Sequence, residues 1–480
     1  MQKKFLSNLV ITLGANLLVK PLWILGIDRT FQNRLGLEQY GIYTNLFTFS
    51  LILGLLLDFG INNYNSSSLA RTPGLLTKQF VPLLSLKGLL GLVYVTLTLL
   101  LGMFYGFGKH ELYLLVMLSL NQCMAYASTY FRSTLTGLQF YRTDAYISAV
   151  DRLTMLIGGT ALLFLWTTEV SIDVFVYLQS AGYFIAMLVS LGALTPHLKA
   201  IQFKMEWEQL KPVFYKSLPY ATLALIMMLY TRLDVLLIKK LLPEGDTENG
   251  MYAQSTRLLE AVNMMAVLVS GLLLPMFSAI IRKRQSITPL VKLAMMVLLV
   301  PAIMGVVFCY VYGSDIMNLL YLDTSDYQTS VFKLCISSVL PMCVMYVFGT
   351  LVTAKGKMTV LIRFALVALV FNVAANIYVI PRYGALGAAG VALVTHSIIA
   401  VSNTYVALTR LLLSITLVHL VKFPLFGFLC YAALIIFRSQ ELFSIPVLLT
   451  LYVFIGLLLS LVLQIMDRDT LKRAIKRLRE

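Results

Sequence analysis

Charged side chains occur inside stretches of this sequence that are otherwise apolar enough to cross a lipid bilayer. A charge in hydrocarbon costs at least about 2.5 to 3.5 kcal/mol on insertion scales, so it persists where it faces a cavity, a partner or a ligand. Such groups can pair with one another, bind an anion, or carry a proton or a sodium ion. The residues of this kind are Lys20, Asp58, Lys87, Arg232, Asp234, Arg257, Glu260 and Lys333.

Most of these charges lie on the first, second, seventh and eighth apolar stretches. We expect Lys20 in the outer part of the first stretch, and Arg232 and Asp234 in the outer part of the seventh. Arg257 and Glu260 lie one helical turn apart near the outer end of the eighth. One interpretation is a cationic cavity that receives an anionic head group. In the other, the acids and bases neutralise one another and Lys20 extends toward an interface.

Polar residues accompany the acid of the second stretch, which lies in its cytoplasmic half. Asp58, Asn62 and Asn65 are spaced by four and three residues, which places them on one helical face. We interpret Asp58, Asn62, Asp234 and Glu260 as polar or ion-coupling residues, for a proton or for sodium.

Other polar residues in apolar stretches have two interpretations. Lys87 and Lys333 lie near the ends of their stretches and are predicted to be interfacial anchors. The remaining set suits either sugar hydroxyls or hydrogen bonds between helices; it comprises Asn121, Gln122, Tyr126, Ser128, Thr129, Tyr130, Asn372 and Asn376.

Apolar runs long enough to position these residues in a bilayer recur along the whole chain. Of its 480 residues, 59% are hydrophobic and only 12% are charged, which predicts an all-α polytopic membrane protein. A helix needs about 20 apolar residues to cross the hydrocarbon, and about fourteen such spans fit the sequence. They lie near 7–27, 41–66, 80–104, 112–131, 145–166, 174–194, 217–238, 251–281, 290–312, 330–353, 360–380, 385–409, 413–436 and 443–465.

The distribution of charge predicts the topology. Lys and Arg gather in alternate connections and acids in the others, so the formal charge of +16 indicates cytoplasmic loops rather than nucleic-acid binding. Both termini are then cytoplasmic, and the basic tail is expected on the head groups of membrane lipids. The five cysteines and four histidines show no ligand spacing, so no metal site or cofactor is predicted.

The chain divides into two similar sets of six spans, a pattern expected of an ancestral duplication. Asp28 and Gly41-Ile-Tyr43 of the first set correspond to Asp234 and Gly250-Met-Tyr252 of the second. Both sets have the same orientation in the membrane, so the repeat is parallel. The predicted parts are a six-helix bundle over 1–194, a basic cytoplasmic linker over 195–216, a second bundle over 217–410, helices thirteen and fourteen over 411–465, and a basic cytoplasmic tail over 466–480.

Several of these motifs resemble the polysaccharide flippases of the multidrug/oligosaccharidyl-lipid/polysaccharide exporter superfamily. The resemblance covers roughly residues 1 to 410 and rests on several motifs that occur in the same order along the chain. They are Arg34-Leu-Gly-Leu-Glu-Gln-Tyr-Gly-Ile-Tyr43, Asp58-Phe-Gly60, Leu69-Ala-Arg71, Arg232-Leu-Asp234, Gly250-Met-Tyr252, Ile380-Pro-Arg-Tyr-Gly384 and Gly387-Ala-Ala-Gly390.

The resemblance implies two bundles in a V shape that rock between inward-open and outward-open states, in the cytoplasmic membrane of a bacterium. It implies a cationic cavity in which Lys20, Arg232 and Arg257 contact phosphate or acidic sugar of a polyprenyl-pyrophosphate-linked oligosaccharide. It also implies glycosyltransferases or a glycan polymerase as partners. Two helices beyond twelve are unlike the O-antigen flippases and similar to the lipid II flippase, so the glycan class stays open.

Two other function classes compete with lipid-linked oligosaccharide transport. A cation-coupled multidrug exporter of the same superfamily would prefer a net acidic cavity, whereas the charges predicted here are balanced. A glycan polymerase or glycosyltransferase would normally carry catalytic acids or bases in a sizeable outer loop. The largest outer connection, 313–329, holds only Asp315, Asp323 and Asp326, so an enzyme is not predicted.

Overall fold

The structure is a computed structural model that describes residues 19–165, 170–198, 210–322, 324–410, 417–440 and 445–465. Within these residues the regular structure is entirely helical. The start of the first predicted span, residues 199–209 of the predicted linker and the basic tail lie outside the described residues.

The chain divides into two compact units, Met1–Ala253 and Gln254–Glu480. This division falls later in the chain than the linker predicted over 195–216. The short helical turns of the first unit are η1 (Trp23–Asp28, a π-helix), η2 (Leu55–Leu57), η3 (Pro73–Leu75) and η4 (Thr195–His197). Its α-helices are α2 (Arg29–Gly54), α3 (Ile61–Arg71), α4 (Leu76–Tyr105), α5 (Lys109–Gly137), α6 (Tyr141–Ile147), α7 (Val150–Leu165), α8 (Ile172–Leu194) and α9 (Leu210–Leu241).

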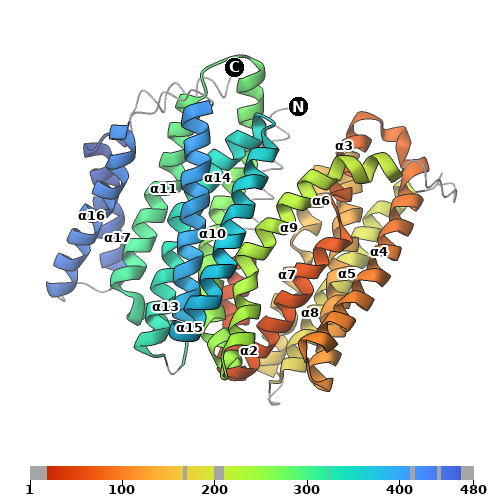
Figure 1. Cartoon of the computed structure of the whole chain (residues 1–480), viewed down its shortest axis with the longest axis horizontal. Helices are drawn as coiled ribbons and strands as arrows, with labels where there is room; N and C mark the ends of the chain where they lie inside the picture. The colour runs from red at the N-terminus through yellow and green to blue at the C-terminus, as the bar shows by residue number, and fades with distance from the viewer. Residues whose placement is uncertain are drawn as a thin grey trace. The chain divides into compact units, whose positions relative to one another are not determined.

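The second unit is built from the helices that follow, and the first of them begins in the first unit (Figure 1). They are α10 (Gly245–Arg282), α11 (Thr288–Val311), α12 (Gly313–Leu320), α13 (Asp326–Ser337), α14 (Val339–Ala354), α15 (Met358–Arg410), α16 (Leu417–Gln440) and α17 (Ile445–Val462).

The long apolar runs form long helices, as the composition predicts. In the described residues, 10 helices are long and apolar enough to cross a membrane. Two of them, Val19–Arg71 and Met358–Thr409, each hold two of the predicted spans. The fourth and fourteenth predicted spans fall on α5 and α17, which are not among these 10. The structure therefore places a helix at every predicted span, although it does not establish fourteen crossings.

Two glycines allow the double-length helices to turn. Gly36 has φ 77° and Gly384 has φ 58°, in the left-handed region that costs glycine little and other residues more. The segment predicted to connect the first two spans is therefore helical up to Gly36 and again after it. The first span runs into the second without a loop.

Each unit has its own packed interior. In the first unit, α5 packs along α8, and α7 packs on α8 where Gly182 admits the side chain of Met155. In the second unit, α11 contacts both α14 and α16, and its side chains form the centre of one continuous apolar cluster. Figure 1 shows α16 and α17 beside α11. Because lipid is as apolar as these side chains, close packing and hydrogen bonds hold such helices together.

Candidate functional site

The second predicted span is broken at its acid. The helix of α2 and η2 ends at Leu57, and α3 starts at Ile61. Between them Phe59 has φ 41° and Gly60 has φ 77°, so the helix cannot continue. Asp58 lies in this break.

The partner of Asp58 is Lys87 of α4. The Lys87 Nζ atom lies 3.0 Å from Asp58 Oδ1, and the Lys87 side chain is 7% exposed. Lys87 is therefore a buried ion-pair partner, and its prediction as an interfacial anchor was wrong. Lys333, the other predicted anchor, lies half-buried with its Nζ 5.3 Å from the centre of the Tyr310 ring.

The asparagines predicted to share a face with Asp58 have different roles. The backbone N–H of Asn62 donates to Asp58 Oδ1 over 3.2 Å, so Asn62 contacts the acid through its main chain. The Asn65 amide donates to Ser133 Oγ at 2.9 Å and to Thr134 Oγ1 at 2.8 Å. Asn65 thus joins α3 to α5, and its place in the fold is structural.

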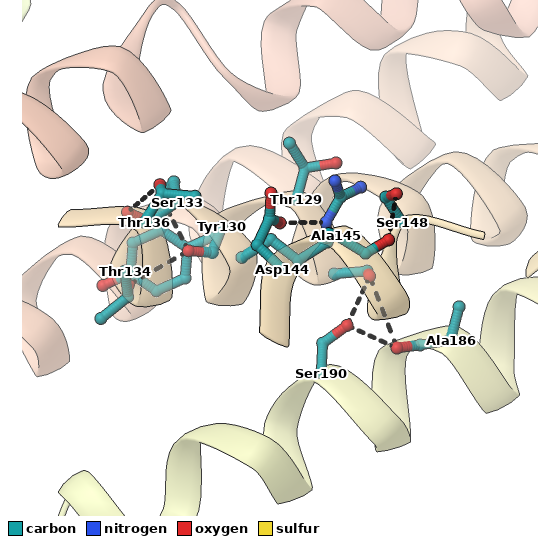
Figure 2. Close-up of polar contacts among 12 residues, drawn as sticks. Thr129, Tyr130, Ser133, Thr134, Thr136, Asp144, Ala145, Ser148, Ala186 and Ser190 are labelled. Atoms are coloured by element: carbon teal, nitrogen blue, oxygen red, sulfur yellow. Dashed lines mark hydrogen bonds and ion pairs between the residues drawn. The ribbon is translucent and has the colours of Figure 1, made fainter. Parts of the chain in front are cut away.

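Two polar residues of the fourth predicted span make hydrogen bonds to neighbouring helices. The Ser128 and Ser190 hydroxyl oxygens lie 2.7 Å apart and join α5 to α8. The Tyr130 hydroxyl donates to the Phe80 carbonyl of α4 at 2.9 Å. Figure 2 shows the surroundings of Ser190 and of the hydroxyl residues of α5. These contacts follow the second of the two interpretations of such residues, hydrogen bonding between helices.

The asparagines of the eleventh predicted span also bond within the protein. Asn372 and Asn376 are fully buried in α15. The Asn376 amide donates to Asn372 Oδ1 at 3.1 Å, and the Asn372 amide donates to Thr395 Oγ1 at 3.1 Å across the bend of the same helix. They stabilise the bend of α15.

Lys20 lies beside the start of α7. Arg152, Asp151 and Arg132 are the charges with which it interacts. Gly159 follows Arg152 by seven residues, and Ile27 follows Lys20 by seven. A Cβ on Gly159 would lie 2.5 Å from the side chain of Ile27. The first helix and α7 are therefore parallel, and Lys20 is level with the first turn of α7. Under the predicted topology this level is cytoplasmic, whereas the sequence suggested the outer part of the span.

The charges around Lys20 form a half-buried cluster with a net positive charge. Arg132 Nε donates to Asp144 Oδ1 at 2.6 Å, as the dashed line to Asp144 in Figure 2 marks. Arg152 Nε lies 3.6 Å from Asp151 Oδ2. Three cations thus face two carboxylates. Sequence reasoning missed this set, although Asp151 and Arg152 lie inside the fifth predicted span (145–166); two adjacent charges there were the available signal.

Asp234 is almost fully buried in α9, with 1% of its surface exposed. Its carboxylate accepts a hydrogen bond from the Tyr252 hydroxyl of α10 and one at 3.0 Å from the backbone N–H of Val235. Arg232, half-buried on the same helix, interacts with it electrostatically. Arg232 and Asp234 therefore lie together, as their spacing suggests.

A second buried aspartate occupies the corresponding place in the first half. Asp28 is 2% exposed and accepts hydrogen bonds from the Tyr40 hydroxyl at 3.0 and 3.2 Å and from the Gln32 amide at 3.2 Å. The repeat pattern pairs Tyr252 with Tyr43, but the tyrosine on Asp28 is Tyr40, one helical turn earlier. The two halves thus share the chemistry of this contact with a shift in register.

Arg257 and Glu260 form an ion pair on one face of α10. Arg257 Nη1 lies 2.9 Å from Glu260 Oε2, and the two side chains are 18% and 26% exposed. This is the neutralising contact that one interpretation of the sequence expects. Both residues belong to the second unit, whereas Lys20, Asp58, Asn62, Arg232 and Asp234 belong to the first.

The glycines of the two repeated motifs lie against each other inside the first unit. A Cβ on Gly41 of α2 would overlap the backbone carbonyl of Asp246 and lie 3.0 Å from the backbone nitrogen of Gly250. A Cβ on Gly250 would overlap the backbone carbonyl of Leu37. The backbones of α2 and α10 therefore cross in direct contact, where only glycine fits.

Comparison with known proteins agrees with this arrangement of helices and motifs. The family model described as "Polysaccharide biosynthesis protein" matches residues 5–281. The chain belongs to this family. A search of curated proteins finds no match.

The fold is shared with solved membrane transport proteins. The lipid II flippase MurJ in an inward closed conformation is similar at 14% identity, with a TM-score of 0.70, over 96% of this chain and 100% of that one. An inward-facing multidrug resistance MATE family transporter of the MOP superfamily has 14% identity and a TM-score of 0.61, over 83% and 94% of the two chains. A MOP superfamily transporter from Pyrococcus furiosus has 15% identity and a TM-score of 0.53, over 84% and 93%.

Proposed function

We propose that this protein moves a polyprenyl-pyrophosphate-linked oligosaccharide, such as an O-antigen or capsule repeat unit, from the cytoplasmic to the outer leaflet by alternating access. The observation that carries the proposal is the family match over 5–281, on a chain that shares the fold of the lipid II flippase along 96% of its length. We place the protein in the cytoplasmic membrane of a bacterium, with both termini in the cytoplasm. Glycosyltransferases and a glycan polymerase are the partners that this role needs.

The substrate's pyrophosphate requires cations within the protein. The cluster of Lys20, Arg132 and Arg152 offers an amine and two guanidinium groups with one net positive charge. Guanidinium groups bind phosphate oxygens in pairs, and half-burial strengthens the attraction because water screens it less. We assign this cluster to the pyrophosphate at the cytoplasmic side, and Arg232 and Arg257 to later positions of the substrate.

Movement of the substrate can be coupled to a proton or to sodium through a carboxylate. In the structure, Asp58 is paired with Lys87, Asp234 with the Tyr252 hydroxyl, and Glu260 with Arg257. A coupling ion must therefore replace one of these internal partners. The proposal expects such an exchange at one of the three carboxylates during each transport cycle.

Mass spectrometry of lipid-linked glycans tests the proposal directly. Cells that lack the protein should accumulate one polyprenyl-pyrophosphate oligosaccharide, and the wild-type chain should clear it. Lys20→Gln and Arg257→Ala should fail to clear it at normal expression levels. Arg142→Gln is the matched control, because Arg142 is exposed on the short helix next to Asp144 and should behave as wild type. A leaflet-access assay separates transport from polymerisation.

One observation favours a second candidate, a cation-coupled multidrug exporter. The fold also matches a multidrug resistance transporter with a TM-score of 0.61. If the lipid-linked glycans are unchanged in cells that lack the protein, the flippase proposal fails. Loss of dye and drug efflux in the same cells would then support the exporter.

A further inference from the structure

The helix break at Asp58 leaves a backbone carbonyl without its usual partner. In an unbroken helix the N–H of Ile61 would donate to the carbonyl of Leu57. Here it donates to the carbonyl of Asp58 at 2.7 Å instead. The Leu57 carbonyl is thus available at the C-terminal end of a helix, where the helix dipole attracts positive charge.

The ammonium of Lys87 occupies this position. Its Nζ donates to the Leu57 carbonyl at 3.0 Å and to Asp58 Oδ1 at 3.0 Å. The same atom lies 5.7 Å from the centre of the Tyr130 ring, within range of a cation–π interaction. A carbonyl, a carboxylate and an aromatic face therefore surround one positive charge.

These groups are the ones that bind small cations elsewhere. In transporters, carbonyls of unwound helices and the C-terminal ends of half-helices coordinate sodium. We propose that the break in the second span is a monovalent cation site whose resident occupant is the ammonium of Lys87, carried by the protein itself.

The pairing has a consequence for ion coupling. While Lys87 is in place, Asp58 and the Leu57 carbonyl are engaged and take up no ion from solution. If transport is ion-coupled, as proposed above, the exchanging carboxylate is then Asp234 or Glu260. The cation site itself does not depend on that coupling, since it rests on the contacts of Lys87 alone.

Removing the tethered ammonium should open the site to free cations. Lys87→Ala leaves space for an ion and for an apolar stem like that of the lost lysine side chain. Lys87→Met fills the space of the stem and leaves space for the ion only. The full-length variants are purified, and their thermal unfolding is measured in sodium chloride and in choline chloride at equal ionic strength. Sodium should raise the unfolding temperature of both variants by at least about 2 °C relative to choline. Wild type and the exposed-lysine control Lys78→Ala should respond to sodium alike, and the effect in the Lys87 variants is measured as the excess over theirs.

Two further arms identify the site. Propylammonium carries N–H donors on a short apolar stem, so it should stabilise Lys87→Ala more than choline does. It should stabilise Lys87→Met less, because the methionine fills the space for the stem. Both sodium and propylammonium effects should disappear in Asp58→Asn/Lys87→Ala.

Several results would overturn the proposal. If neither sodium nor propylammonium changes the unfolding temperature of the two Lys87 variants, the helix break does not bind cations. If these cations stabilise Asp58→Asn/Lys87→Ala as much as Lys87→Ala, they bind at a site other than the helix break. Failure of both variants to fold in either cation would show that no free ion can replace Lys87.

Discussion

The buried contact between Tyr252 and Asp234 allows a quantitative test of the structure. Tyr252→Phe removes one hydroxyl and keeps the ring. Asp234 is 1% exposed and then retains backbone N–H groups, those of Val235 and of Asp234 itself, as donors. A hydrogen bond to a charged group contributes about 1.5 to 3 kcal/mol, and its loss removes one of the donors that stabilise this buried carboxylate.

This loss should be visible as a lower unfolding temperature. For a unit of this size, about 1.5 to 3 kcal/mol corresponds to a decrease of roughly 3 to 12 °C. The measurement is thermal unfolding of the purified full-length protein, followed by tryptophan fluorescence or by light scattering.

Tyr40→Phe is the matched control in the first half. Asp28 has a similar burial but also accepts a hydrogen bond from the Gln32 amide, so this variant should lose less stability. An unfolding temperature of Tyr252→Phe within about 1 °C of wild type would refute the reasoning, since it would mean that the hydroxyl contributes nothing to the buried carboxylate.

Three further substitutions test other contacts. Gly41→Ala places a methyl group on a backbone carbonyl and should destabilise the protein by about 1 to 3 kcal/mol, whereas Gly88→Ala, with nothing within 4 Å, should be neutral or stabilising in denaturant unfolding. Asn65→Leu removes two side-chain hydrogen bonds to α5 and should cost about 1 to 3 kcal/mol in the same assay; an unchanged midpoint would contradict it. Asn121→Leu should not destabilise the protein, because neither polar atom of this buried side chain has a hydrogen-bond partner in the described part of the chain; a loss above about 1 kcal/mol would show a missed partner.

The positions of the helices could be predicted because they depend on a local property of the sequence. A helix in lipid needs a certain length of apolar residues, and that length is visible without knowledge of the fold. The third span, predicted over 80–104, is the helix Leu76–Tyr105. The ion pair of Arg257 and Glu260 was equally accessible, since a spacing of three residues brings side chains together on one helix.

Contacts between helices were not predictable in the same way. Lys87 and Asp58 are 29 residues apart on different helices, and spacing along one helix carries no information about its neighbour. The level of Lys20 relative to Asp151 and Arg152 of α7 depends on packing between two helices, which its position within the first span does not give. The shift from Tyr43 to Tyr40 is one turn of helix, a difference that the repeat pattern alone cannot resolve.

The crossing of Gly41 and Gly250 has an evolutionary consequence. If the chain arose by duplication, these glycines descend from one residue, and each now lies against the helix of the other. In an ancestral dimer the same contact would have been isologous, with one glycine facing its own copy across the twofold axis. Any side chain gained there would have entered the interface twice. After fusion of the two genes, each position could change alone, so the crossing became a place where the halves could begin to differ.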